Sequence, residues 1–228
     1  MARWQREKEQ VLALARRMAA RGLVSGTSGN VSVRIEVKGK TGLIAVTPTS
    51  FPYDTMSPDD IQVVSFEGVT VEGTLKPSME TRLHLGIYRA RPNVNAVIHT
   101  HSVYASAVAV TGQSIPPITE EQVIYLGGEI ACAPYAPSGT EELARAALEA
   151  LGDRSGVLLR NHGAIGTGKD PAAAFTACEL LEKCAQVYLL ALSAGTAEPL
   201  PEATVAHWQA VYARAMRTGD TPSESAGA

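Results

Sequence analysis

Two histidines, His99 and His101, lie one residue apart in the apolar stretch AVIHTHS (96–102) of a chain that has only five histidines. Alternate residues of a β-strand point to the same face, about 6.5–7 Å apart along it, so two imidazoles in this pattern could hold one metal ion. The alternative is a strand end at which both rings form only hydrogen bonds. A third histidine, His162 in RNHGAIG, would complete the three-nitrogen set of a catalytic zinc that keeps one coordination position open.

The two remaining histidines are weaker candidates for metal ligands. His84 lies four residues after Glu80 on the same face of an expected helix, a spacing that resembles a metal-binding pair. We favour a packed or supporting role for His84. His207 falls in the expected C-terminal helix.

A glycine-rich turn, SGTSGNVS (25–32), lies between an expected helix and an expected strand. Such a turn exposes backbone N–H groups, and Thr27, Ser28 and Asn30 add side-chain donors, so the segment could bind an oxyanion. Small polar residues also form ordinary turns, which is the alternative reading. Two further turns carry hydroxyl groups: TPTS (47–50) and KPS (76–78).

The segment GAIGTGKD (163–170) matches the GxxxxGK part of a phosphate-binding loop. It ends in Asp170, where such a loop needs the hydroxyl of Ser or Thr to bind magnesium. A carboxylate at this position would also repel phosphate. We therefore expect no nucleotide site here, and we interpret Asp170 and Pro171 as the cap and first turn of a helix.

Hydrophobic periodicity and turn residues predict one α/β domain over residues 1–217, built as three layers with a largely antiparallel sheet between helices. Gly22 is expected to end the first helix, and Ser138 and Glu141 are spaced as a capping box. Residues 218–228 are expected to be a disordered tail. The predicted helices cover 4–21, 77–90, 103–110, 138–151, 171–194 and 202–217; the predicted strands lie in 30–37, 43–47, 61–73 (a hairpin), 96–101 and 156–168 (two strands around a turn).

The composition is that of an ordinary globular protein: 228 residues, 45% hydrophobic, 19% charged and a net charge of −3. There is no basic segment typical of nucleic-acid binding. No apolar run approaches the ~18 residues of a membrane span, and the polar N-terminus does not resemble a signal peptide. The three cysteines lack a CxxC spacing and are expected to be buried free thiols. We therefore expect a cytoplasmic protein.

Several motifs together resemble the class II aldolase/adducin family. They are GTSGNVSVR, VTPTSFPY, KPSMETRLHLGIYRARPNVNAVIHTHS, IPPI, CAPYAPSGTEEL and LLRNHGAIG, and their order and spacing extend the resemblance over about residues 8 to 195. The HxH segment, with an acid upstream and His-Gly downstream, is its most specific part. The resemblance implies an antiparallel sheet flanked by helices and a homotetramer with active sites between subunits.

The resemblance also implies the residues of an active site. Zinc, or another divalent metal, would be held by His99, His101 and His162, with Glu80 as the catalytic acid/base and a further candidate ligand. The implied contacts to a substrate phosphate come from six residues in the polar turns: Thr27, Gly29, Asn30, Thr49, Ser50 and Ser78.

Two positions depart from the family pattern. The family has a pair of serines before the acid, and the second is Met79 here, which removes one phosphate contact. Family aldolases also carry a tyrosine a few residues after the IP motif, where SIPPITEEQ has Glu120. Proton delivery to an aldehyde oxygen would then fall to Glu120, or to Tyr212 as the counterpart of a C-terminal tyrosine in the family. The alternatives for Glu120 are a hydrogen bond to a substrate hydroxyl and a solvated loop carboxylate without a role.

The function implied by the resemblance is the reversible cleavage of a ketose 1-phosphate, such as fuculose 1-phosphate or a related deoxyketose phosphate, to dihydroxyacetone phosphate and a small aldehyde. An epimerase of phosphorylated pentuloses is the main alternative: Glu80 favours the aldolases, whereas the acidic Glu120 favours the epimerases. Other sugar-phosphate lyases, namely decarboxylases and dehydratases, also remain open. A metal-free, adducin-like binding module is disfavoured because all three histidines and Glu80 are present.

Overall fold

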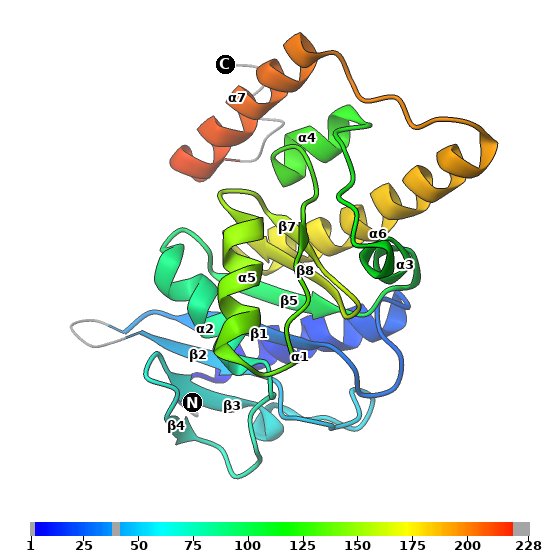
Figure 1. Ribbon diagram of the computed structural model, residues 1–228. Coiled ribbons are helices and arrows are strands. Elements are labelled where there is room, and N and C mark those ends of the chain that lie inside the picture. The colour runs from blue at the N-terminus through cyan, green and yellow to red at the C-terminus, as the bar shows by residue number, and fades with distance from the viewer. Residues whose placement is uncertain (1–2, 38–41, 221–228) are drawn as a thin grey trace.

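A computed structural model of the chain describes residues 3–37 and 42–220, which form one eight-stranded sheet with helices on both faces (Figure 1). The strands are β1 (Asn30–Ile35), β2 (Leu43–Val46), β3 (Gln62–Ser65), β4 (Thr70–Glu72), β5 (Ala96–Thr100), β6 (Cys132–Ala133), β7 (Gly156–Leu159) and β8 (Gly163–Gly168). The helices are α1 (Gln5–Ala20), α2 (Thr81–Ala90), α3 (Val103–Thr111), α4 (Glu120–Leu126), α5 (Glu141–Leu151), α6 (Pro171–Ala194) and α7 (Glu202–Thr218), with a short 3-10 helix at Pro58–Asp60.

The strand order across the sheet is β4-β3-β2-β1-β5-β8-β7-β6. Every neighbouring pair is antiparallel except β6 with β7, so the predicted, largely antiparallel α/β sheet is confirmed. Strands β1 and β5 pair with Asn30 opposite His99 and Ser32 opposite Val97. Because directly opposite residues share a face, these four side chains lie on one side of the sheet.

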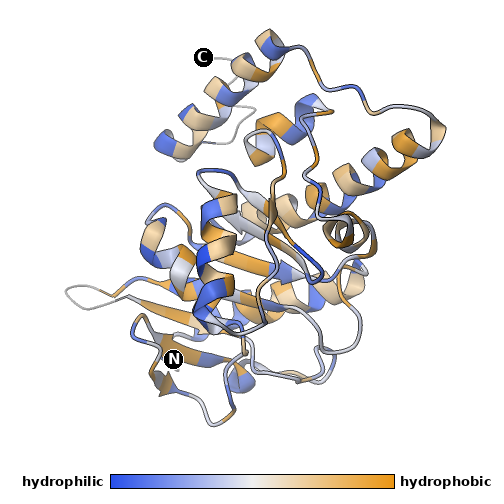
Figure 2. Cartoon of the chain, in the orientation of Figure 1, coloured by the Kyte–Doolittle hydropathy of each residue, from blue (hydrophilic) through white to orange (hydrophobic). Residues whose placement is uncertain are grey.

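Helices cover both faces of the sheet and divide the core into layers. Helices α1 and α6 pack on one face, with α3 against α6, whereas α2 and α5 cover the other face. The strands are largely hydrophobic, and α5 carries hydrophilic residues among its apolar ones (Figure 2). Helix α7 packs on α4 and is joined to α6 by a long connection (Figure 1). This arrangement buries apolar surface on both sides of the strands that lead to the histidines.

The segment GAIGTG forms β8, an interior strand, and not a loop. A Cβ at Gly166 would lie 2.5 Å from Cys178 Sγ, and a Cβ at Gly168 would lie 2.2 Å from the backbone nitrogen of Ala174. These glycines therefore let α6 lie directly against the strand. Asp170 caps α6 by accepting a hydrogen bond from the Ala173 N–H at 2.8 Å, as predicted.

Several element boundaries differ from the sequence predictions. Helix α2 begins at Thr81 and not at Pro77 or Ser78, because Ser78 N–H bonds to the Thr47 carbonyl and its segment bridges to the TPTS turn. The predicted capping box at Ser138 is wrong, since Thr140 caps α5 by accepting from Leu143 N–H at 3.1 Å. The short elements α4 and β6 were not predicted.

Residues 221–228 of the predicted tail, and residues 38–41 between the predicted strands 30–37 and 43–47, lie outside the described residues. The three cysteines are free thiols, of which Cys178 and Cys184 are buried and Cys132 is partly exposed. Within residues 3–37 and 42–220, no helix combines the length and apolar character needed to cross a membrane.

Candidate metal centre and active site

The three histidines are brought together by the ends of adjacent strands. His99 is the fourth residue of β5, and His101 follows the last residue of that strand. His162 lies in the tight turn between β7 and β8, and β8 pairs directly with β5. The turn contains Asn161 in a left-handed conformation, with φ of 56°. The sequence pattern therefore becomes a spatial cluster because a hairpin places its turn beside the end of β5.

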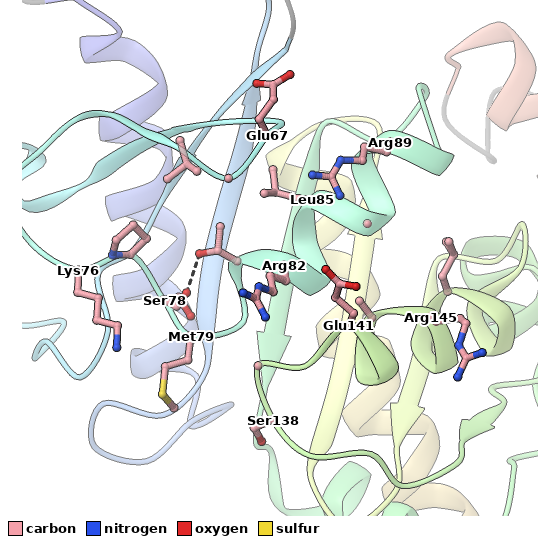
Figure 3. Close-up of a pocket in the computed structure, with 18 residues that line it drawn as sticks. Glu67, Lys76, Ser78, Met79, Arg82, Leu85, Arg89, Ser138, Glu141 and Arg145 are labelled. Atoms are coloured by element: carbon pink, nitrogen blue, oxygen red, sulfur yellow. Dashed lines mark hydrogen bonds between the residues drawn. The ribbon is translucent and has the colours of Figure 1, made fainter.

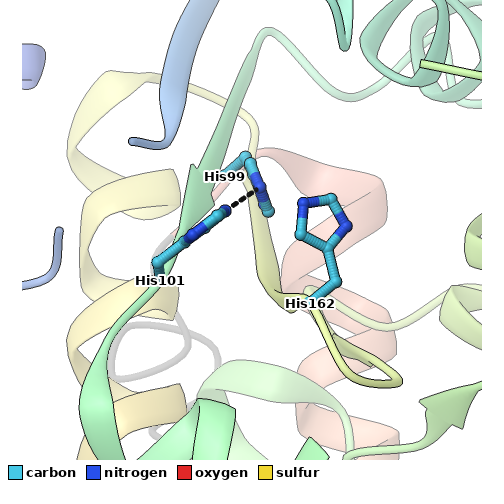
Figure 4. A group of neighbouring side chains, drawn as sticks. All are labelled: His99, His101 and His162. Atoms are coloured by element: carbon cyan, nitrogen blue, oxygen red, sulfur yellow. Dashed lines mark hydrogen bonds between the residues drawn. The ribbon is translucent and has the colours of Figure 1, made fainter. Parts of the chain in front are cut away.

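The imidazole rings converge on one point (Figure 4). Each ring offers a nitrogen, and these three nitrogens lie within 4.8 Å of one another. His101 Nε2 lies 2.8 Å from His99 Nε2. On its other side, the His99 ring donates from Nδ1 to the Ala164 carbonyl at 3.0 Å. Because a carbonyl can only accept, this bond leaves His99 Nε2 without a proton and available as a ligand.

Burial keeps the three rings neutral. His99 is 1% exposed, and burial together with the neighbouring His162 and His101 holds its pKa well below the usual value. Burial and His101 lower the pKa of His162 to about 4. Burial also lowers the pKa of His101. Neutral imidazoles with free lone pairs are the form of histidine that binds metals.

The Glu80 carboxylate faces the same cluster. Its Oε2 lies 3.3 Å from His99 Nε2, and its Oε1 lies 3.6 Å from His162 Nε2. Glu80 directly precedes α2, but its side chain makes no capping hydrogen bond and is left to point at the histidines. Burial raises the pKa of Glu80 to about 7, an effect that the nearby Gly139 backbone amide partly opposes. Such a carboxyl group can take up and release protons near neutral pH.

The donor set fits a divalent metal ion. Both carboxylate oxygens of Glu80 are buried beside His99 and His162 and have no hydrogen-bond partner among the described residues. Unpartnered buried polar atoms are costly, and a carboxylate left in this way beside imidazole nitrogens indicates a missing ligand. Three neutral imidazole nitrogens with an adjacent carboxylate are typical of a catalytic zinc site and of related divalent metals.

His84 lies one turn after Glu80 on α2 but outside the group of three histidines. It is fully buried, and its Nδ1 lies 2.6 Å from Ser32 Oγ. Ser32 Oγ is in turn 2.9 Å from the Tyr88 hydroxyl. Burial lowers the pKa of His84 to about 3, so the ring is neutral. His84 is therefore a buried polar link between α2 and β1.

The triad opens into a pocket of about 400 Å³. All six residues of the expected phosphate set line this pocket together with the triad and Glu80: Thr27, Gly29, Asn30, Thr49, Ser50 and Ser78. Gly29 has a φ of +74°, and a Cβ there would lie 2.6 Å from the His99 carbonyl oxygen. Only glycine fits this close approach of the turn to β5.

Tyr53 holds the glycine-rich turn in place and was not singled out from the sequence. Its hydroxyl lies 3.0 Å from the Ser28 carbonyl and 2.7 Å from the Gly29 carbonyl, to which it can donate. The tyrosine is buried, and its pKa is raised by that burial. Its position in the sequence carried no signal for this role, because its partners lie 24 and 25 residues away in a different turn.

The structure does not bring the two candidate acids of the aldehyde side to the triad of their own chain. Glu120 is exposed at the first position of α4. Tyr212 on α7 is buried, and its hydroxyl donates to the Asp153 carbonyl at 2.9 Å and contacts Ser155 Oγ at 2.8 Å. Ser155 directly precedes β7 and His162 follows its end, so the Tyr212 hydroxyl lies at the opposite end of this strand. Neither residue lines the triad pocket.

A larger groove of about 930 Å³ adjoins the triad pocket and shares Ser78, Met79 and Ser138 with it. In Figure 3, Met79 and Ser138 lie near one end of the groove, whereas Glu67 and Arg89 lie near the other. The Met79 side chain is 59% exposed at the shared border. The groove contains neither the histidines nor Glu80, so its greater size does not make it the chemical centre. The charged residues along it are Glu67, Lys76, Arg82, Arg89, Glu141 and Arg145.

Comparison with known proteins agrees with this geometry. Residues 9–189 match the class II aldolase and adducin N-terminal domain. The chain is 39% identical to a 5-deoxy-D-ribulose 1-phosphate aldolase of Bacillus thuringiensis serovar kurstaki over 87% of this chain and 91% of that protein. It is 37% identical to an L-fuculose phosphate aldolase of Escherichia coli K12 over 84% and 86%. A solved L-fuculose 1-phosphate aldolase superposes with a TM-score of 0.85 at 31% identity, covering 91% of this chain and 96% of that one.

Proposed function

Because the chain belongs to the class II aldolase and adducin family and is a metal-dependent class II aldolase, we propose that it reversibly cleaves a ketose 1-phosphate. The products would be dihydroxyacetone phosphate and a small aldehyde, and fuculose 1-phosphate and deoxyribulose 1-phosphate are the leading substrates. The observation that carries the proposal is the buried Glu80 carboxylate facing three neutral imidazoles at the end of β5.

Zinc is the metal we propose, held by His99, His101 and His162, with the Glu80 carboxylate close enough to serve as a further ligand before substrate enters. When bound, such an ion acts as a Lewis acid that stabilises negative charge developing on a substrate oxygen. The protein contributes a fixed set of neutral nitrogens, of which His99 is oriented by the Ala164 carbonyl. The three imidazoles favour zinc and similar transition-metal ions over magnesium and calcium, which prefer oxygen ligands.

Glu80 is the proposed general base and acid at the carbon next to the carbonyl. Cleavage leaves that carbon carrying excess electron density, and a proton must be delivered to it; in the synthetic direction the same proton must be removed. A carboxyl group whose pKa is near 7 because of burial is suited to both directions. Its position 3.3 Å from His99 Nε2 places it beside the point at which the substrate oxygens would lie.

The phosphate end of the substrate is proposed to lie in the polar turns of the triad pocket. These turns offer hydroxyl groups, the Asn30 amide and backbone N–H groups around Gly29. The Asn30 side chain would donate to the phosphate through its amide nitrogen, since its oxygen can only accept. The chain's net charge of −3 provides no general attraction for an anion, so local contacts must hold the phosphate.

We propose a homotetramer whose active sites lie between subunits, with Glu120 of one subunit acting at the site of its neighbour. This proposal is supported by the exposure of Glu120 at the start of α4, away from its own triad pocket. There it would donate a proton to the aldehyde oxygen or bind a substrate hydroxyl. Tyr212 is the weaker candidate, because its hydroxyl is buried and already hydrogen-bonded within its own chain.

The second candidate function is a 4-epimerase of phosphorylated pentuloses, and the acidic residue at position 120 favours it. The two functions are separated by a panel of ketose 1-phosphates and ketose 5-phosphates incubated with zinc-loaded protein. We expect release of dihydroxyacetone phosphate from at least one 1-phosphate and no change in the 5-phosphates. Conversion of a pentulose 5-phosphate to its epimer without such release would establish the alternative.

A further inference from the structure

His101 differs from the other proposed ligand of its strand in how it is supported. His99 is fixed by its hydrogen bond to the Ala164 carbonyl. The His101 ring is half-buried, and among the described residues its hydrogen-bonding contact is the one to His99 Nε2. Ligand histidines usually have a partner on their second nitrogen, because that partner fixes the ring's orientation. The direction of His101 must therefore depend on the backbone that carries it.

That backbone runs directly from β5 into α3. His101 lies between the last residue of β5 and Ser102, which precedes the first helical residue. Ser102 occupies the N-cap position of α3 but makes no side-chain capping bond, and its buried hydroxyl has no hydrogen-bond partner in the part of the chain that the structure describes. The first N–H groups of a helix need an acceptor, and serine at this position usually provides one. Another residue takes over this task.

The acceptor is the carboxylate of Glu182, which comes from α6. Its Oε1 accepts from the Tyr104 N–H at 3.0 Å, and its Oε2 accepts from the Ala105 N–H at 2.9 Å. The negative charge also interacts favourably with the positive end of the helix dipole. Helix α6 packs on β5 and β8, so Glu182 ties α3 to the framework that holds the histidines.

We propose that Glu182 is a positioning residue that holds His101 in the geometry needed to bind the metal; this inference rests on the proposed role of the triad as the metal site. The segment 101–105, which links β5 to α3, is held at both ends. At its first residue, the His101 N–H donates to the Leu23 carbonyl at 3.0 Å. At its other end, both oxygens of Glu182 hold the first turn of α3. Removing the carboxylate frees only the second of these ends.

The test is the zinc affinity of the purified full chain, measured by competition with a chromophoric chelator. Glu182→Gln removes the charge and one acceptor, and Glu182→Ala removes the cap entirely. Loss of a group that orients a ligand typically weakens metal binding by about 10–100-fold, and we expect a loss of this size for Glu182→Ala and a smaller one for Glu182→Gln. The matched control is Glu179→Gln on the same helix, which affects ion pairs with Arg17 and Arg21 and should leave zinc affinity unchanged.

A double-mutant cycle separates positioning of His101 from general destabilisation. We combine Glu182→Gln with His101→Gln and, separately, with His162→Gln; the glutamines leave weak ligands so that affinity stays measurable. If Glu182 acts through His101, its effect should largely vanish in the His101→Gln background and persist in the His162→Gln background. Equal effects in both backgrounds, or wild-type zinc affinity in both Glu182 variants, would overturn the inference. This test measures zinc affinity and not catalytic activity. The result for Glu182 therefore still holds if the triad binds zinc but the proposed catalytic function fails.

Discussion

Glu80 combines two properties at the scale of the single residue: its carboxylate is buried, and it faces three histidines without a hydrogen-bond partner among the described residues. An isolated buried carboxyl group favours its neutral form, which explains the pKa of about 7. A purely structural role would not account for a carboxylate that is buried without a hydrogen-bond partner. A role in proton transfer at the site would account for it.

Glu80→Gln tests this role with a change that preserves shape. The amide cannot accept a proton, so we expect turnover to fall by about 10²–10⁴-fold while the fold and most of the bound metal are retained. Steady-state kinetics and the metal content of the purified variant give the result. Near-normal turnover in a metal-loaded Glu80→Gln protein would remove Glu80 from the mechanism.

His84 predicts a pH dependence of folding stability. Its pKa is about 3 in the folded chain, below the ordinary value of 6.5 in the unfolded chain, so the folded state binds fewer protons in acid. The free energy of unfolding therefore has its full value above about pH 6.5 and decreases as the pH falls below it, by about 2 kcal/mol at pH 5. His84→Gln lacks this dependence. In urea denaturation with a chelator present, the stability gap between wild type and variant should narrow by that amount from pH 7.5 to pH 5; a constant gap would contradict the assignment.

At the scale of the elements, the site depends on how closely β8 approaches the end of β5. A Cβ at Gly163 would lie 2.3 Å from the Thr100 carbonyl oxygen and 3.1 Å from the His101 ring. Because the first of these atoms belongs to the backbone, the strands would have to shift apart. Glycine at this position therefore sets the distance between the turn that carries His162 and the strand that carries the other two ligands.

We expect Gly163→Ala to destabilise the fold by about 1–3 kcal/mol and to weaken zinc binding. The matched control is Gly86→Ala in α2, where the nearest atom to the new Cβ is Ala144 Cβ at 3.6 Å. That substitution should be neutral or stabilising because alanine favours a helix over glycine. Urea denaturation and zinc titration of both variants give the comparison. Equal behaviour of the two would show that the close approach at Gly163 has no effect on the site.

The sequence predicted the elements that are long or strongly patterned. The alternating runs of β1 and β5, the two hairpins and the Asp170–Pro171 start of α6 were all expected, and so was the HxH pair at a strand end. Shorter elements such as α4 and β6 have too few residues for a periodicity to emerge. The start of α2 was misplaced because Ser78 pairs with the distant Thr47 carbonyl, which local propensity does not reveal.

The site residues could likewise be predicted where the local sequence is characteristic, and not where a distant partner decides their role. The ligands and the polar turns have recognisable residue types, and the structure places them around one pocket. Tyr53 and Glu182 support that pocket through partners 24 and 77 residues away, and nothing in their immediate sequence indicates those contacts. The roles of Glu120 and Tyr212 were predicted only from the resemblance to the family. Their positions away from the triad of their own chain could not be read from spacing.

At the scale of the whole molecule, the proposed tetramer predicts a mass of about four times the 24.0 kDa of one chain in sedimentation equilibrium. It also predicts complementation, because Glu80 and Glu120 of one site would come from different subunits. Glu80→Gln and Glu120→Gln proteins, each impaired alone, should regain part of the activity when their subunits are mixed and reassembled. A chain that remains monomeric, or mixtures no more active than the average of the two variants, would contradict the shared site.

The central claim is that the His99, His101 and His162 cluster binds the metal on which aldol cleavage depends. The most direct test is the rate of dihydroxyacetone phosphate release from the best ketose 1-phosphate, measured for wild type and His162→Ala as purified, after chelation and after zinc is restored. We predict release by zinc-loaded wild type, its loss on chelation, its recovery with zinc, and neither tight zinc binding nor release in His162→Ala. Release that persists in the chelated protein, or in His162→Ala at the wild-type rate, would contradict the account.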